Sequence, residues 1–101
     1  MTDEQKARCR VIAAHYGVEN QKYKACEEMA ELIQVLMKAE TERIEYSHFE
    51  RIIEEIADAC IMMEQLRFLF GEVDVDNKIT AKLNRQLKRM EDEDGKTNSL
   101  K

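Results

Sequence analysis

Apolar residues recur along most of this chain at steps of three and four, which is the spacing of one face of an α-helix. A first helix is expected over about Asp3–Tyr16. Thr2 and Gln5 form a capping box before it, and Gly17 is a natural stop after it. A second helix is expected over about Asn20–Lys38. Its apolar stripe is wider than one packing face needs, which indicates burial on two sides.

Two more helices are expected in the second half of the chain. The third is predicted over Ser47–Phe70, with Glu50 completing a capping box and a glycine ending it. The fourth is predicted to start near Asp74 or Asp76, since either can cap a helix. Its apolar seam consists of Val75, Ile79, Leu83, Leu87 and Met90. The polar stretch 39–46 is expected to be a loop or a fraying helix end.

The pattern as a whole predicts an all-α protein. The chain has 101 residues, no proline and three glycines, which is typical of one domain that is helical nearly throughout. We expect residues 1–91 to form a bundle of about four helices, in which the second and third make an antiparallel hairpin. Residues 92–101 show no apolar pattern and are expected to be a mobile C-terminal tail.

Charge and cysteine usage narrow the class of protein. A formal net charge of −5 argues against a general nucleic-acid binder, which needs a basic surface. The first residues lack the apolar core of a signal peptide, and no apolar run is long enough to span a bilayer. Cys9, Cys26 and Cys60 have no C-x-x-C spacing and lie in helical apolar patterns, so buried reduced thiols are expected. These features predict a cytoplasmic protein.

Two acidic pairs stand out in the expected hairpin. Glu28 and Glu31 are three residues apart in the second helix, and Glu55 and Asp58 are three apart in the third, so each pair occupies one face of its helix. At about 100° per residue, Glu28 and Glu55 each fall between apolar neighbours, and both pairs are predicted to point into apolar faces. Buried carboxylates need a partner or a proton. A hard divalent cation such as Mg²⁺ would hold all four together.

A simpler interpretation needs no metal. Lys24 precedes Glu28 by four residues and Arg51 precedes Glu55 by four, so two intrahelical salt bridges could neutralise half of the acids. Such pairs contribute only about 0.3–0.5 kcal/mol each. A single E-x-x-E pair would favour this interpretation, but two copies in apolar faces favour the metal.

The acidic pairs also carry a family resemblance. The segments EEMAE, at 27–31, and EIAD, at 55–58, resemble the EExxE…ExxD pattern of the MazG-like, all-α nucleoside triphosphate pyrophosphohydrolases. The similarity runs from about Asn20 to Arg89 and is greatest to short phage-type and bacterial single-domain members. The resemblance implies hydrolysis of a nucleoside triphosphate to the monophosphate and pyrophosphate. By position it implies a Mg²⁺ site, with Mn²⁺ as an alternative ion, whose ligands are Glu28, Glu31, Glu55 and Asp58.

The resemblance suggests further site residues. Glu27 would lie at the edge of the site and orient the attacking water or help hold an extra metal, while its plainer interpretation is a surface charge. Lys82 and Arg85 resemble a Lys and an Arg three apart on the corresponding helix of the family, although Thr80 stands where many relatives have asparagine. Together with Lys24, they are the candidate substrate-binding residues. A solvated helix face is the alternative for the basic residues of this helix.

These observations lead to more than one functional hypothesis. The first is a Mg²⁺-dependent nucleoside triphosphate pyrophosphohydrolase that clears unwanted nucleotides. The second is a helical assembly or regulatory module that binds nucleotide without turnover. The third is a coiled-coil-like structural protein with salt-bridged acids and no metal. Wide apolar faces on a small chain predict a homodimer or homotetramer. A nucleoside triphosphate is the expected partner, and neither nucleic acid nor a membrane is.

Overall fold

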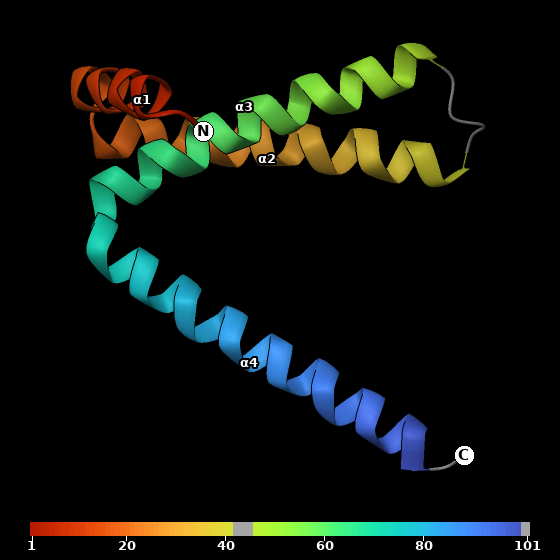
Figure 1. Ribbon diagram of the computed structural model, residues 1–101. Helices are drawn as coiled ribbons and strands as arrows, with labels where there is room; N and C mark the ends of the chain where they lie inside the picture. Colours follow the sequence, from red (N-terminus) through yellow and green to blue (C-terminus); the bar gives the residue numbers. More distant parts are fainter. Residues whose placement is uncertain (42–45, 100–101) are drawn as a thin grey trace. The chain divides into compact units, whose positions relative to one another are not determined.

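The described part of the chain is all-helical (Figure 1). The computed structural model describes residues 1–41 and 46–99, which form four helices and no strand. The helices are α1 (Asp3–Tyr16), α2 (Val18–Thr41), α3 (Tyr46–Phe70) and α4 (Glu72–Ser99). The predicted fold class is therefore confirmed. The chain divides into two compact units, Met1–Phe70 and Gly71–Lys101, which we describe separately.

The start of α1 follows directly from its sequence. The backbone N–H of Gln5 donates to Thr2 Oγ1 at 3.1 Å, and the backbone N–H of Thr2 donates to Gln5 Oε1 at 2.7 Å. This is the predicted capping box, and it satisfies two N–H groups that the first turn would leave without partners. At the other end, Gly17 takes a φ of 85°, which favours glycine. That turn lets α2 begin at once, at Val18.

The capping box makes a testable contribution to stability. We expect Thr2→Ala to lower the free energy of unfolding by about 1 kcal/mol, because the hydroxyl acceptor of the cap is lost. Thr2→Ser keeps that acceptor and should stay near the wild type. Thermal or urea denaturation of the three proteins measures the difference. Equal losses in both variants would show that the cap does not stabilise the fold.

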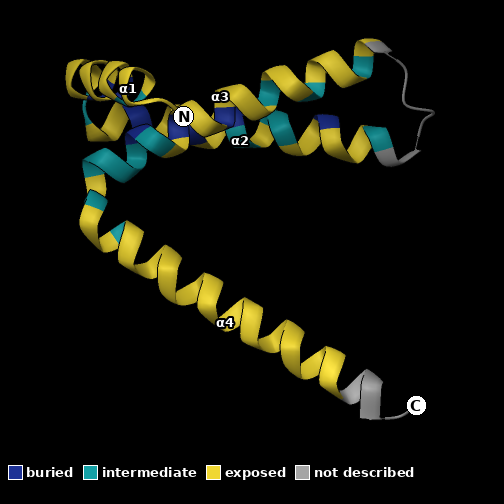
Figure 2. Cartoon of the chain, in the orientation of Figure 1, coloured by how far each residue is buried: buried dark blue, intermediate teal, exposed yellow. Residues whose placement is uncertain are grey.

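The core of the first unit lies where α1, α2 and α3 meet. Figure 1 shows α2 and α3 side by side as the antiparallel hairpin that the sequence predicts, with α1 against one end of it. The buried residues concentrate near this junction (Figure 2). The buried apolar residues are Cys9, Ala13, Ala25, Val35, Ala59 and Met62. Because Ala25 and Ala59 are small, the backbones of α2 and α3 can approach closely enough for acids on both helices to converge.

Several helix boundaries differ from the prediction. The second helix, α2, spans Val18–Thr41 and so extends beyond both predicted ends, while 42–45 of the predicted loop lie outside the described residues. The third helix starts at Tyr46, so Ser47 lies inside it and is not its N-cap. Gly71, with a φ of 129°, permits α4 to start directly after α3, at Glu72. Acidic side chains in that first turn complement the helix dipole.

In the second unit, α4 is longer than predicted. The prediction that the helix ends near residue 91 was wrong, because α4 continues to Ser99. The stretch 92–99 contains no proline and only one glycine, so no residue stops the backbone hydrogen bonding where the apolar pattern ends. Mobility of the final residues stays a prediction. The apolar side chains of α4 are about half exposed, namely Ile79 at 47%, Leu83 at 53%, Leu87 at 57% and Met90 at 56%.

The cysteines only partly follow the prediction. All three are free thiols, and Cys9 is buried, but Cys26 and Cys60 are exposed. The prediction of three buried thiols was therefore wrong for two of them, because helical periodicity places a residue on one face of its helix but does not determine whether a neighbouring helix covers it. Burial, together with the negative charge of Glu64, raises the pKa of the Cys9 thiol. In the residues that the structure describes, no helix combines the length and apolar character needed to cross a membrane.

Candidate metal centre

Three of the four predicted metal ligands lie together in the hairpin. Glu28 and Glu31 from α2 and Glu55 from α3 each place a carboxylate oxygen within 4.8 Å of the other two. We call these three residues the acid cluster. The i, i+3 spacing brings the two acids of α2 together, and the close approach of α3 adds the third. Carboxylate oxygens from separate helices, gathered at this separation, are what a hard divalent cation coordinates.

Two oxygens of the acid cluster are buried without a partner. Glu28 is only 9% exposed. Its Oε2 and the Oε2 of Glu55 are both inaccessible to solvent and accept no hydrogen bond from any described residue. Leaving a buried carboxylate oxygen unsatisfied is costly, and a cation between the two helices would remove that cost. The orphaned oxygens therefore point to a ligand independently of the clustering.

The electrostatics of the acid cluster agree with this view. The pKa of Glu31 is raised, first by the negative charge of Glu28 and then by desolvation, with further contributions from Glu55 and from a side-chain hydrogen bond with Glu28. The protein alone therefore opposes full ionisation of the cluster. A divalent cation would reverse that effect by placing positive charge among the same oxygens.

The salt-bridge alternative accounts for one oxygen of the acid cluster. Lys24 Nζ lies 3.1 Å from Glu28 Oε1, and this contact is the main cause of the raised pKa of Lys24. The other oxygen of Glu28 stays unpaired. Among the described residues no ion pair joins Arg51 to Glu55. Because the Lys24 side chain is 50% exposed, water screens its interaction. The ion pair and a metal can therefore occupy different oxygens of Glu28.

The structure does not bring Asp58 into the acid cluster. Asp58 is exposed, although it lies one turn from Glu55 on α3. The prediction that both acidic pairs are buried was therefore wrong for Asp58, and Glu31 is also only partly buried. Helical spacing determines which way a side chain points on its own helix, but not how deeply a neighbouring helix covers it. A metal-binding role for Asp58 stays a prediction.

The other predicted site residues lie at the edge of the acid cluster or in the second unit. The Glu27 side chain is 62% exposed and lies 3.8 Å from Lys24 Nζ, so it is a peripheral charge in this structure. Lys82 and Arg85 are exposed on α4. Their substrate-binding role stays a prediction.

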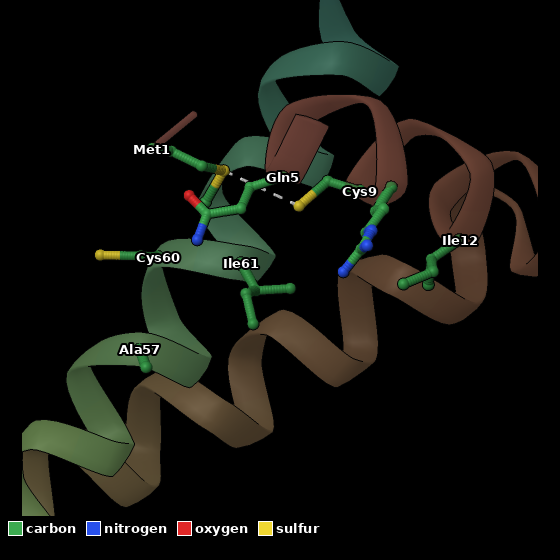
Figure 3. Close-up of a pocket in the computed structure, with 8 residues that line it drawn as sticks. Met1, Gln5, Cys9, Ile12, Ala57, Cys60 and Ile61 are labelled. Carbon is green, nitrogen blue, oxygen red and sulfur yellow. Dashed lines mark hydrogen bonds between the residues drawn. The ribbon is translucent and has the colours of Figure 1, made fainter. Parts of the chain in front are cut away.

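A cleft between α1 and α3 is not part of the acid cluster. It has a volume of about 500 Å³, and the residues labelled in Figure 3 include Met1, Cys9 and Cys60 from its wall. The Met1 and Cys9 sulfur atoms face each other at 3.9 Å, whereas the Cys60 sulfur points away from them (Figure 3). The residues that line this cleft include no Asp or Glu, and its sulfur atoms do not converge on one point. The cleft therefore does not resemble a metal site.

A buried polar pair between α2 and α3 was not predicted from the sequence. Gln21 on α2 donates from Nε2 to Gln65 Oε1 on α3, and these side chains are only 5% and 2% exposed. The available signal was two glutamines at positions that share a helix face with Glu28 and Met62.

Comparisons with known protein families, with curated proteins and with solved structures find no match to this chain.

Proposed function

We propose that this protein is a Mg²⁺-dependent nucleoside triphosphate pyrophosphohydrolase of the MazG-like type. The observation that carries the proposal is the pair of buried, unpartnered carboxylate oxygens of Glu28 and Glu55 within the acid cluster. The resemblance of the segments at 27–31 and 55–58 to the EExxE…ExxD pattern supports the same activity. Mg²⁺ suits the site because it takes oxygen ligands and shares its coordination sphere with phosphates, and Mn²⁺ is the alternative ion.

The residues of the site suit attack by water on the α-phosphorus. Anionic oxygens shield that phosphorus, so the reaction needs positive charge and a positioned nucleophile. A bound divalent ion supplies the charge and lowers the pKa of coordinated water. The acid cluster would hold the ion, with Asp58 as a fourth ligand. Glu27, at the exposed edge, would accept the proton of the attacking water as the bond between the α-phosphorus and its bridging oxygen to the β-phosphorus breaks.

Positive side chains would help to neutralise the phosphate charge. Lys24 already lies against the acid cluster and would act near the α-phosphate. A substrate-binding role for Lys82 and Arg85 of α4 rests on the resemblance alone. The products would be a nucleoside monophosphate and pyrophosphate, which suits a cytoplasmic enzyme that removes unwanted nucleotides.

We also propose that the protein acts as a homodimer or homotetramer. Large apolar side chains are exposed along α2 and α3, including Ile33 at 60%, Met37 at 57%, Phe49 at 56% and Ile53 at 62%. Exposed apolar rows on two helices of so small a chain favour association with another copy. The same rows also fit the second hypothesis, a nucleotide-binding or assembly module without turnover.

A nucleotide panel with product identification tests the activity. The full chain is incubated with ribo- and deoxyribonucleoside triphosphates and Mg²⁺, and products are separated by ion-exchange chromatography. We expect monophosphate and pyrophosphate in equal amounts, and no product in excess EDTA. Release of diphosphate and inorganic phosphate would contradict cleavage at the α-phosphorus. No turnover of any nucleotide, combined with Mg²⁺-dependent thermal stabilisation, would favour the non-catalytic module.

A further inference from the structure

The acid cluster is the centre of a longer row of polar residues on the hairpin. On α2, one face at successive steps of three and four carries Gln21, Lys24, Glu28, Glu31, Val35 and Lys38. On α3, the same steps give His48, Arg51, Glu55, Asp58, Met62 and Gln65. We call these two rows together the hairpin strip. Figure 1 shows that α2 and α3 are antiparallel. The order of residues along them therefore gives the strip carboxamides at one end, acids in the middle and cationic side chains at the other end.

Contacts at three levels show that the two rows meet along the seam between α2 and α3, where buried members such as Gln21 alternate with exposed ones such as Lys24. At one end, Gln21 is hydrogen-bonded to Gln65 across 44 residues of sequence. In the middle, the acid cluster joins α2 to α3 within 4.8 Å. At the other end, a cleft of about 300 Å³ has a wall formed by Val35, Lys38, His48 and Arg51 together with Gln34. The hairpin strip is therefore continuous along both helices.

The carboxamide end has the character of a nucleobase site. Gln21 and Gln65 are part of a cleft of about 690 Å³, whose other walls include Ile12 and Tyr16 of α1 and Met62 of α3. Their mutual hydrogen bond uses one N–H of Gln21 and the Oε1 of Gln65, so Gln21 Oε1, the second N–H of Gln21 and both N–H groups of Gln65 Nε2 are not engaged by it. A base edge presents donors and acceptors of the same kind, and apolar walls suit its faces.

The opposite end has the character of a phosphate site. Lys38 and Arg51 carry positive charge, and His48 adds an imidazole to the same cleft. Arg and Lys are the side chains that bind phosphate oxygens most strongly. Seven residues separate Gln21 from Glu28, and seven separate Glu31 from Lys38, so each end lies roughly 10 Å along α2 from the acids. The separation on the base side suits a nucleoside, and on the phosphate side the long Lys38 and Arg51 side chains can extend back toward the acids.

We propose that a nucleoside triphosphate lies lengthwise along the hairpin strip. The base occupies the cleft of Gln21 and Gln65, the α-phosphate lies at the acid cluster, and the outer phosphates lie at the cleft of Lys38, His48 and Arg51. This assignment rests on the proposed function for the position of the α-phosphate. It makes the two glutamines the residues that select the base, and it directs the leaving pyrophosphate toward Arg51.

The carboxamide end is tested by the double variant Gln21→Met/Gln65→Met. Replacing both partners leaves no orphaned amide in the core, which protects the fold. We expect kcat/KM for the preferred base to fall roughly tenfold, while the poorest base is unaffected, so discrimination between bases shrinks. Gln86→Met, which changes an exposed glutamine of α4 outside the hairpin strip, is the matched control and should keep the wild-type discrimination. Unchanged discrimination in a folded double variant would overturn the assignment.

The cationic end is tested by Arg51→Met. Losing a charged phosphate contact should raise KM roughly tenfold for every nucleotide and leave the ratio between bases unchanged. A change in base preference in Arg51→Met would mean that the base lies at this end, and the proposed direction would be wrong.

NMR binding measurements test the nucleotide-binding assignment of the hairpin strip separately from the proposed hydrolysis. Ribonucleosides without phosphate should shift the side-chain amide signals of Gln21 and Gln65. Inorganic tripolyphosphate with Mg²⁺ should shift the Arg51 Nε–H signal and leave the two glutamine amide signals unchanged. If these shifts occur while no nucleotide is hydrolysed, the proposed function fails and the hairpin strip stands as a nucleotide-binding surface. If hydrolysis occurs while nucleosides shift neither glutamine, the strip assignment fails and the function stands.

Discussion

Glu55→Gln is expected to abolish pyrophosphate release and to leave the metal-free protein at least as stable as the wild type. Glu55 is the member of the acid cluster that α3 supplies, and its Oε2 is buried without a partner. The amide removes an anionic ligand, so activity should fall by at least about a hundredfold, since even groups that only orient a metal ligand contribute 10–100-fold. Without metal, the substitution removes a negative charge that raises the pKa of Glu31.

Two measurements on the same variant decide the outcome. Steady-state pyrophosphate release at saturating Mg²⁺ measures the loss of activity, and thermal denaturation in EDTA measures the stability of the metal-free fold. Glu54→Gln changes the neighbouring acid of α3, which is exposed and outside the acid cluster, and should keep both properties. Full activity of Glu55→Gln, or a large drop in its midpoint in EDTA, would contradict the site assignment.

Local chemistry made most of the fold predictable. The α1 helix begins and ends where the capping box of Thr2 and Gln5 and the positive-φ Gly17 require. Gly71 likewise separates α3 from α4. The prediction failed where sequence signals were weak: α4 continues through 92–99 because apolar periodicity reports packing and not backbone hydrogen bonding.

The sequence predicted which helix face carries each acid of the candidate site, but not how deeply each acid is buried or what it contacts on the other helix. The spacing of Glu28 and Glu31 placed both on one helix face, and the second acidic motif predicted the meeting with Glu55. The exposure of Asp58 and the contact between Gln21 and Gln65 were not predictable in this way. Both depend on the register in which α3 packs against α2, and that register is set by the complementary shapes of the two helices.

Mg²⁺ is expected to stabilise the protein, and to do so more strongly as the pH rises. Glu31 has a pKa raised above its ordinary value of 4.5, so in the absence of metal the folded state holds this proton more tightly than the unfolded state. Stability of the metal-free protein should therefore fall as the pH rises through that raised pKa. Metal ligands must be deprotonated, so Mg²⁺ binds best at the same higher pH, where it offsets the repulsion among Glu28, Glu31 and Glu55.

The size of the effect follows from ligand linkage. At a Mg²⁺ concentration of tenfold Kd, the added stability is about 1.4 kcal/mol, which raises the midpoint of a domain of this size by about 6–11 °C. Thermal denaturation with and without Mg²⁺, from about pH 5 to about pH 8, measures the gap between the two curves. Glu31→Gln removes the titrating group, so its metal-free stability should lose the fall with pH and its response to Mg²⁺ should shrink. A gap that is constant across this range, or equal in Glu54→Gln and Glu31→Gln, would show that the cation acts somewhere other than on these three acids.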